Sequence, residues 1–426
     1  MLNRATLNAR PSSSQLMSRV LEVPNLPERV RALTGPALGK LIDRVGLADA
    51  AELVALASTE QLSEIFDQDL WRSAESGVDE RFVAERFLLW LEVMSEVGER
   101  FVAERLADLP QDLVVLAVHR HLWVLSLADL ERELSGDEDE AYAAQKAFES
   151  CLSEELDEYQ LIWRGGDGWD QLLAALVALD RDHHGLLVDL LERCAALSRG
   201  SIDDSGGLYE VLNGEEMLED DLAGERESRR AAAGYVAPSA ALSFLRLAAG
   251  PASDETPLTE HDPLTRAYFR RLDPKRATPA APTAHSPRLL VGAAADLAAP
   301  ATATESLLLQ ALRALADEQP ETLAARAEEL GYLANVLCAG ASFDGRRLRP
   351  VEGIELAIQA VSTGLELACR GEPSAASAAA ALGRYPCDGL LRLAFRLAGR
   401  ADPKRDREAE PKSLATVRRL LKQLKL

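Results

Sequence analysis

Short amphipathic segments follow one another along the first half of the chain. In residues 46–71, GLADAAELVALASTEQLSEIFDQDLW, apolar positions recur at helical spacing on both sides of the sequence STEQ. STEQ fits a capping box, in which the Ser58 side chain accepts a hydrogen bond from the Gln61 backbone N–H and the Gln61 side chain bonds back. The pattern predicts one helix that ends near Ala57 and a second that begins after Ser58.

The same pattern returns further along the chain. Residues 106–123, LADLPQDLVVLAVHRHLW, contain the junction Leu-Pro-Gln-Asp, and residues 172–194, LLAALVALDRDHHGLLVDLLERC, contain DRDHHG in the same place. An earlier fragment, VPNLPERVRAL over residues 23–33, has a matching Leu-Pro-Glu junction. Because the spacing is irregular, we predict a loose helical repeat whose stacked helix pairs form a superhelical block.

The junction DRDHHG also contains side chains that bind metals or transfer protons. As a helix junction, Asp180 or Asp182 caps the following helix, and His183 and His184 lie in its exposed first turn. Neighbouring helix positions point about 100° apart, so the two imidazoles do not readily converge on one ion, and the junction is the preferred interpretation. The alternative is an enzyme or metal site between helices, with these candidates: His119, His121, Asp180, Asp182, His183 and His184.

A glycine cluster, GGDGWD at residues 165–170, raises the question of a phosphate-binding loop. It lacks the Lys-Ser/Thr of a P-loop and does not follow a convincing strand. We therefore predict a tight turn between two helices.

The composition of the sequence changes after residue 250, where Pro, Thr and Ser become frequent. Beyond this segment, ESLLLQALRALADEQPETLAARAEELGYLANVLCAG predicts two helices with a break at Pro320 and an end at Gly340, and Pro350 begins a further helix. The fold class predicted is all-α. The predicted divisions are a helical-repeat-like domain over 1–250, a linker or irregular crossing segment over 251–304, a smaller helical domain over 305–398 and a basic tail helix over 399–426.

The tail reverses the charge of the chain, with nine basic and four acidic residues over 399–426. SLATVRRLLKQLKL places leucine and valine along one helix face, and on the other face it places Arg418, Arg419, Lys422 and Lys425. Such a helix can lie on a membrane surface, bind a partner, or dock on the acidic body of its own chain.

A second group of basic residues lies in the predicted loop Ser342–Arg349, which contains Arg346, Arg347 and Arg349. In a chain that is otherwise acidic, these arginines predict an interface with another protein or a second copy of the chain. The alternative is that they pair with the protein's own carboxylates.

Composition narrows the classes of function. Lys and Arg number 47 against 69 Asp and Glu, and the formal charge of −22 disfavours binding to nucleic acid or anionic lipid except through the basic tail. No run of about 18 apolar residues occurs, and the first thirty residues lack the apolar core of a signal peptide. The five cysteines are widely spaced without a CxxC pair, which predicts buried free thiols, a cytoplasmic location and no cofactor.

Three stretches of the chain resemble a bacterial family of unknown function, made of all-helical cytoplasmic proteins. They are VGLADAAELVALASTEQLSEIFDQDLW (45–71), RRAAAGYVAPSAALSFL (229–245) and YLANVLCAGASFDGRRLRPVEGIELAIQAVSTGLELA (332–368). The resemblance implies a helical fold and carries no activity, cofactor or catalytic residue. More weakly, the helix junctions are similar to those in the cytosolic helical domain of magnesium-channel proteins and in flagellar switch proteins, where stacked helices form interaction surfaces.

Repeat-like helix pairs, separated charges and the lack of a recognisable catalytic constellation favour one function. We expect a non-enzymatic cytoplasmic scaffold or adaptor that binds another protein or itself. Two alternatives stay open: an enzyme or metal-binding protein with a site near Asp180–His184, and recruitment to a membrane surface by the C-terminal helix.

Overall fold

The chain divides into two compact units, each with its own hydrophobic core. The computed structural model describes residues 13–128, 130, 151–203, 213–250, 257–272, 307–343, 346–369, 374–399 and 412–425. Unit 1 comprises residues 1–72 and 81–225, and unit 2 comprises residues 73–80 and 226–426. The division therefore falls within helix α12 (Gly214–Ala232), whereas the sequence analysis places it at residue 250.

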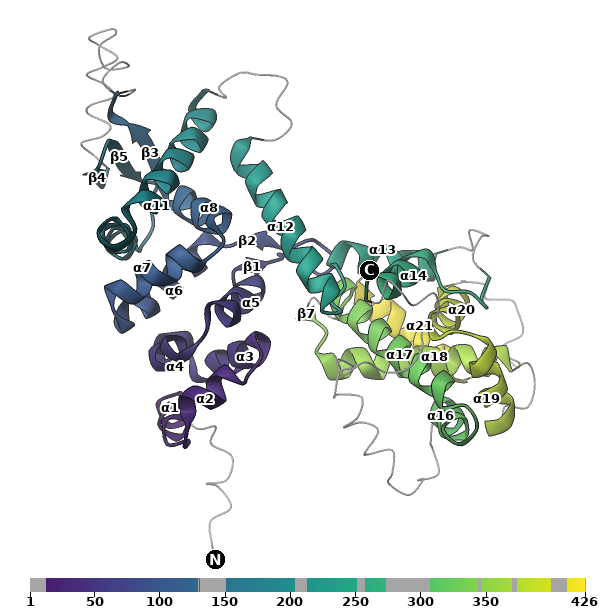
Figure 1. Cartoon of the computed structure of the whole chain (residues 1–426). Helices are drawn as coiled ribbons and strands as arrows, with labels where there is room; N and C mark the ends of the chain where they lie inside the picture. The colour runs from purple at the N-terminus through teal and green to yellow at the C-terminus, as the bar shows by residue number, and fades with distance from the viewer. Residues whose placement is uncertain are drawn as a thin grey trace, which may run out of the picture. The chain divides into compact units, whose positions relative to one another are not determined.

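Unit 1 begins with a series of short helices (Figure 1). They are α1 (Ser13–Leu21), α2 (Leu26–Arg31), α3 (Gly35–Val45), the 3₁₀ turn η2 (Leu47–Asp49), α4 (Ala51–Leu56), α5 (Thr59–Asp69), α6 (Ala84–Val97), α7 (Glu99–Asp108) and α8 (Gln111–His121). The predicted capping box begins α5: the Gln61 N–H donates to Ser58 Oγ at 3.2 Å, and the Ser58 N–H donates to Gln61 Oε1 at 2.9 Å. The Gln61 amide also donates to the carbonyls of Val30 and Leu33, so the cap ties α5 to the end of α2.

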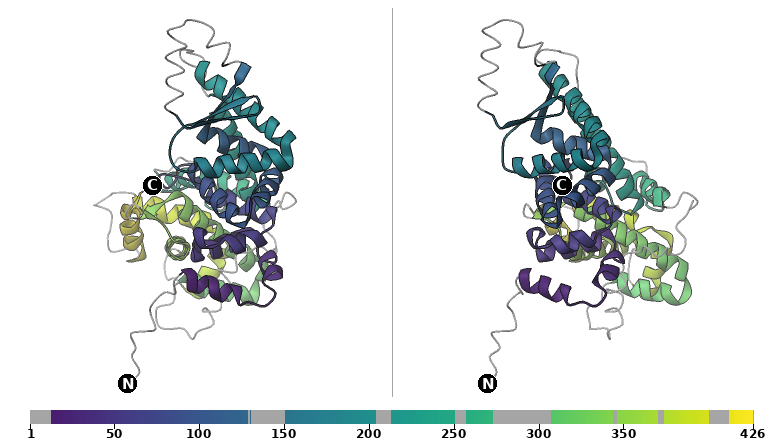
Figure 2. Two further views of the ribbon diagram at one scale, coloured as in Figure 1. Left: turned by 90° about the vertical axis from the view of Figure 1, so that its left-hand side faces the viewer. Right: turned by 60° about the vertical axis from the view of Figure 1, so that its left-hand side comes forward.

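A three-stranded antiparallel sheet and a long helix complete unit 1. The strands are β3 (Leu122–Ser126), β4 (Ser153–Leu156) and β5 (Tyr159–Trp163), in the order β3-β5-β4. They lie beside α11 (Trp169–Asp203), as the views of Figure 2 show. GGDGWD connects β5 to α11, so the prediction of a turn between two helices is wrong, because the preceding segment YQLIW pairs with both neighbouring strands.

Helix α11 contains the predicted junction as a kink rather than a break. His183 has non-helical backbone angles, φ −144° and ψ 49°, and helical geometry resumes after it. The expected caps are absent, because the Asp180 carboxylate bonds to His184 and the Asp182 carboxylate pairs with Arg181. The kink therefore takes the place of the expected capped junction.

Unit 2 is also mostly helical, which confirms the predicted fold class apart from small sheets. Its elements are α13 (Pro238–Ala249), α14 (Pro263–Leu272), α16 (Leu307–Glu318), α17 (Pro320–Gly340), β6 (Ser342–Phe343), β7 (Arg346–Arg347), α18 (Pro350–Ala368), α19 (Ala375–Arg384), α20 (Cys387–Gly399), α21 (Lys412–Gln423) and β8 (Leu424–Lys425). The predicted breaks at Pro320, Gly340 and Pro350 are confirmed. Helix α14 lies within the predicted linker, so that segment is not irregular throughout; its residues 251–256 and 273–304 lie outside the described residues.

The loop between β1 (Trp71–Arg72) and β2 (Arg81–Phe82) belongs to unit 2. The Gly77 N–H donates to the Ala339 carbonyl at 3.1 Å, and the Glu80 carboxylate lies 2.5 Å from Arg226 and 2.8 Å from Arg230. These contacts attach the loop to α17 and to the later part of α12. The sequence analysis places this loop in the domain predicted over 1–250, because its contact with Ala339 lies far along the chain.

Close approach between helices explains the abundance of small residues. A Cβ at Gly364 of α18 would lie 2.6 Å from the Leu390 carbonyl carbon of α20, well inside normal carbon contact of about 3.5 Å. A Cβ at Gly340 of α17 would lie 2.7 Å from backbone atoms of Ala241 and Leu242 in α13. Glycine at these positions lets the helix backbones pack directly.

None of the described helices combines the length and apolarity needed to cross a lipid bilayer.

Candidate functional site

The three arginines of the predicted interface are paired within the chain. Arg346 makes two contacts of 2.7 Å with the Glu352 carboxylate, which also accepts from Arg349 at 2.7 Å. These arginines hold the pKa of Glu352 well below its usual range. Arg347 lies 3.6 Å from Glu80. The self-paired alternative of the sequence analysis therefore describes this loop, although the guanidiniums remain half exposed or more.

The basic tail helix docks on its own chain. On α21, Leu414 and Val417 are buried against α18 and α20, and Leu424 of β8 is buried as well. The Arg418 guanidinium donates to the Ala398 carbonyl at 3.3 Å, whereas Arg419 and Lys422 are exposed. Lys425 lies in β8 and pairs along the backbone with Ser342 of β6. The apolar face that membrane recruitment requires is thus already used within unit 2.

Two of the six histidine and aspartate candidates are used in packing. His119 is fully buried at the end of α8, with Nε2 3.1 Å from Glu215 Oε2 of α12. Arg120 and Arg164 contact the same carboxylate at 2.7 and 3.3 Å. Burial opposes ionisation of Glu215, but His119 and the two arginines lower its pKa to about 2. His121 stacks on a tryptophan ring, and burial lowers its pKa.

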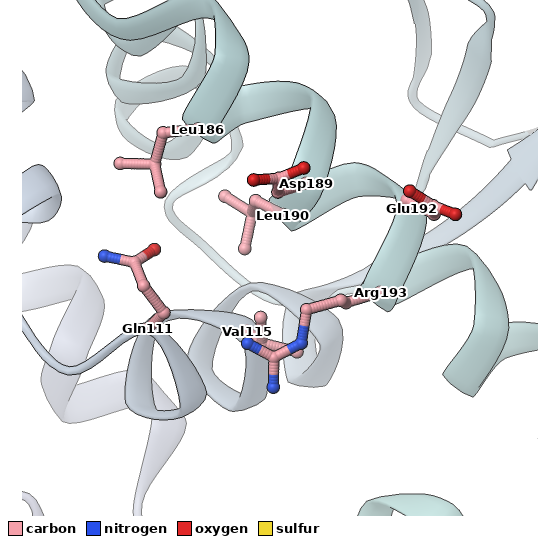
Figure 3. A pocket seen from close by; sticks show the side chains of 7 residues that line it. All are labelled: Gln111, Val115, Leu186, Asp189, Leu190, Glu192 and Arg193. Atoms are coloured by element: carbon pink, nitrogen blue, oxygen red, sulfur yellow. The ribbon is translucent and has the colours of Figure 1, made fainter.

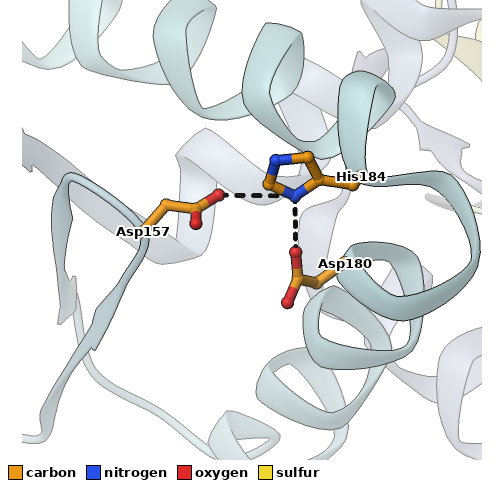
Figure 4. Close-up of side chains that lie close together, drawn as sticks. All are labelled: Asp157, Asp180 and His184. Atoms are coloured by element: carbon orange, nitrogen blue, oxygen red, sulfur yellow. Dashed lines mark hydrogen bonds and ion pairs between the residues drawn. The ribbon is translucent and has the colours of Figure 1, made fainter.

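The kink of α11 brings together two candidates and one residue that sequence reasoning missed (Figure 4). The Nδ1 atom of His184 lies 2.7 Å from Asp180 Oδ1 and 3.7 Å from Asp157 Oδ2. Asp157 lies in the turn between β4 and β5 and has a left-handed φ of 53°. Within the described residues, these three form the one group of three or more His, Cys, Asp or Glu side chains whose ligand atoms all lie within 4.8 Å of one another.

The remaining candidates do not join this group. Asp182 pairs with Arg181 at 3.0 Å, and the same arginine lies 3.0 Å from Glu99. His183 is the residue at the kink itself, and His119 contacts α12 as described above. The predicted metal set is therefore divided by the fold, and only Asp180 and His184 converge.

A small cavity of about 260 Å³ lies between α8 and α11 (Figure 3). Its apolar lining is Val115, Leu186 and Leu190, and its polar lining is Gln111, Asp189, Glu192 and Arg193. Arg193 pairs with Asp112, and the Gln111 amide donates to three carbonyls at the end of α7. Two of the four polar side chains in the lining are thus already engaged within the chain.

A larger open groove of about 550 Å³ lies where α1, η2, α4 and the end of α6 meet, and we call it the α1–α4–α6 groove. Its lining residues are Met17, Ser18, Leu21, Ala48, Asp49, Ala51, Glu52, Ala55, Glu96 and Val97. Leu21 and Val97 are 47% and 37% exposed. The exposed carboxylates of Asp49, Glu52 and Glu96 make no ion pair with any residue that the structure describes, and no basic residue is part of the lining.

Sequence reasoning missed this groove although its parts are visible in the sequence. LADAAELVALA places alanines and acidic residues on adjoining helix positions, a pattern that alone is typical of a solvent-exposed helix. The groove appears only when α1 and the end of α6 pack beside α4.

Unit 2 contains a buried charge network that sequence reasoning also missed. His261 Nδ1 lies 2.8 Å from Asp388 Oδ1 and its Nε2 lies 3.5 Å from Glu329 Oε1. Arg326 pairs with Glu329, and Arg392 lies 3.5 Å from Asp388. Both carboxylates are fully buried. Burial alone would lower the pKa of His261, but the two carboxylates raise it.

This network fixes backbone segments and does not resemble a nucleophilic site. The Glu329 carboxylate accepts from the Cys387 N–H at 2.7 Å, and the Asp388 carboxylate accepts from the Asp262 N–H at 2.8 Å. The Cys387 thiol is fully buried, and burial with the Glu329 charge raises its pKa far above the ordinary value. The protonated thiol is a poor nucleophile, so we assign the network to stability.

All five cysteines lie within the described residues and are free thiols. Cys194 and Cys387 are buried, as expected, and burial raises the pKa of Cys194 to about 12. Cys338 and Cys369 are partly buried, and Cys151 is exposed, so the expectation of burial is wrong for Cys151.

Comparison with known proteins gives a family without an assigned activity. No curated protein and no solved structure matches the chain. Residues 3–201 match a family model described as "Family of unknown function (DUF6178)". This span includes the α1–α4–α6 groove and the group at the kink of α11, and it confirms the resemblance to a family of unknown function; the analogies to magnesium-channel and flagellar switch proteins stay predictions. Residues 3–201 of the chain are therefore similar to this family of unknown function.

Proposed function

We propose that the protein is a non-enzymatic cytoplasmic adaptor and that its α1–α4–α6 groove binds a basic amphipathic helix of another protein. The observation that carries this proposal is an apolar groove rimmed by three carboxylates, Asp49, Glu52 and Glu96, that form no ion pair with any described residue. No basic residue is part of its lining. The five free thiols support a reducing compartment such as the cytoplasm.

The apolar part of the groove suits a helix. Three alanines, Ala48, Ala51 and Ala55, form a floor of small side chains, which lets a second helix approach closely. Leu21 and Val97 remain substantially exposed and would be covered by apolar side chains spaced three or four residues apart on the bound helix. Each Å² of apolar surface so covered contributes about 25 cal/mol.

The rim selects the charge of the partner. Each exposed ion pair contributes only about 0–1 kcal/mol, so the carboxylates supply specificity and speed of association more than affinity. A helix with lysine or arginine beside its apolar stripe matches all three carboxylates, and an acidic helix is repelled. The net charge of −22 also attracts a basic partner toward the protein before contact and repels an acidic one.

Other surfaces support the adaptor less well. The arginines of the β6–β7 loop have counter-charges within the chain, and the apolar face of α21 is buried. A catalytic function would need the histidine candidates to converge, and His119 and His121 are engaged in packing.

Titration of a synthetic leucine–lysine helical peptide tests the proposal. Fluorescence anisotropy should show saturable binding that weakens with salt, and an analogue with glutamate for lysine should not bind. Glu52→Lys with Glu96→Lys should weaken binding about tenfold or more, which corresponds to about 1.4 kcal/mol.

The matched control makes the same change in net charge elsewhere in unit 1. Glu154 and Glu155 are exposed on β4, and Glu154→Lys with Glu155→Lys should leave peptide affinity within about twofold. Equal weakening by both double variants would mean that only overall charge matters, and the groove would lose its role.

A further inference from the structure

We propose that Asp157, Asp180 and His184 form a binding site for a divalent first-row transition cation, with Zn²⁺ as the best-matched ion. The site lies in unit 1 but shares no residue with the α1–α4–α6 groove. The proposal is therefore independent of the adaptor function.

The donor set has the chemistry that such cations prefer. One imidazole nitrogen and two carboxylate oxygens suit Zn²⁺, whose usual protein ligands include His, Asp and Glu. A neutral imidazole and two carboxylates carry a total charge of −2, which the cation neutralises. With a proton in place of the cation, the same group carries a net charge of −1. The hydrogen bond to Asp180 and the charge of Asp157 raise the pKa of His184, so a cation has to displace this proton.

The geometry needs only small movements of exposed side chains. Tetrahedral Zn²⁺ at about 2.0–2.1 Å from each ligand atom places those atoms about 3.3 Å apart. The distances from His184 Nδ1 are 2.7 Å to Asp180 and 3.7 Å to Asp157, one shorter and one longer than this value. Figure 4 shows both carboxylates directed at the same ring nitrogen, with Asp157 to its left and Asp180 below it.

The ligands come from two elements that the sequence separates. Asp157 belongs to the β4–β5 turn, and Asp180 and His184 lie on either side of the kink in α11. The His184, Asp180 and Asp157 side chains are 60%, 38% and 34% exposed. This exposure admits the ion and leaves coordination positions for water, as in zinc sites with three protein ligands. A bound cation would fasten the turn to the helix.

Isothermal titration of Zn²⁺ into chelator-treated protein tests the site. We expect one equivalent to bind and to raise the thermal unfolding midpoint, because the cation binds the folded state. Asp157→Asn, Asp180→Asn and His184→Ala should each weaken that binding about tenfold or more. All three side chains are at least one-third exposed, so each variant should unfold like the wild type in chelator.

Neighbouring residues provide matched controls. Asp182→Asn and His183→Ala change the same residue types on the same kink and should leave Zn²⁺ affinity unchanged. Co²⁺ substitution should show no thiolate charge-transfer absorption, because the site contains no cysteine. Absence of stoichiometric binding, or binding that the three ligand variants leave intact, would overturn the proposal.

Discussion

Replacing Gly364 by alanine tests the helix packing at the centre of unit 2. The Cβ would lie 2.6 Å from the Leu390 carbonyl carbon, about 1 Å inside normal carbon contact. The obstacle is backbone, so no rotamer change relieves it and α18 has to move away from α20. We therefore expect a loss of stability although alanine is the better helix former.

The magnitude follows from opposing contributions. Alanine gains about 1 kcal/mol of helix propensity over glycine. Separating the helices loosens Val361, Leu365 and Leu391, which are all fully buried, and overpacking of this kind costs about 1–3 kcal/mol or more. Because the Cβ collides with main chain, we take the upper part of this range, about 3 kcal/mol. Subtracting the helix-propensity gain of about 1 kcal/mol leaves a net loss of stability of about 2 kcal/mol.

Urea unfolding followed by two signals measures the effect. All five tryptophans lie in unit 1, so their fluorescence reports on that unit, whereas far-ultraviolet circular dichroism reports on both. With a urea slope of about 2 kcal/mol per molar, the midpoint of the unit 2 transition should fall by about 1 M and the tryptophan transition should not move.

The control is Gly224→Ala on α12. A Cβ there meets no atom within 4 Å, so alanine should stabilise by about 0.5–1 kcal/mol. A Gly364→Ala variant as stable as the wild type would refute the close packing of α18 on α20.

Other predictions concern the buried network and the tail of unit 2. Asp388→Asn should cost about 3 kcal/mol, read from the same dichroism transition, because it removes a buried negative charge that faces both Arg392 and His261. Because the pKa of His261 is raised in the folded protein, protonated His261 stabilises unit 2 fully below about pH 6.5. This stabilisation is lost as the pH rises through the pKa of the folded protein. Between about pH 6.5 and 9, the urea midpoint of unit 2 should therefore fall more in the wild type than in His261→Gln. Val417→Asp should destabilise unit 2. Wild-type protein should not float with phosphatidylserine vesicles; flotation abolished by deleting residues 412–426 would contradict the docked position of α21.

The predictions of helix starts and breaks that the structure confirms depend on short local sequence patterns. The capping box at Ser58, the break at Pro320 and the helix start at Pro350 depend on residues three or fewer positions apart. The strands β4 and β5 were missed because their alternation lies within a run of acidic residues that is typical of a solvated loop.

The candidate sites depend on contacts that are distant in sequence. Asp180 and His184 were among the sequence candidates because both lie in the short motif DRDHHG, whereas Asp157 joins them only through the β4–β5 turn. The α1–α4–α6 groove requires α6 to end beside α1, and no local pattern encodes this. His261 was an isolated histidine in sequence and reaches Asp388 only in the folded unit.

The most direct test of the adaptor proposal locates the bound helix. A leucine–lysine peptide with a photoreactive group on its apolar face would be crosslinked to the full chain, and the modified residues identified by mass spectrometry. The account predicts crosslinks on α1, α4 and the end of α6, including Leu21 and Val97, and their loss in Glu52→Lys with Glu96→Lys. Crosslinks confined to other surfaces, unchanged by the double variant, would contradict it.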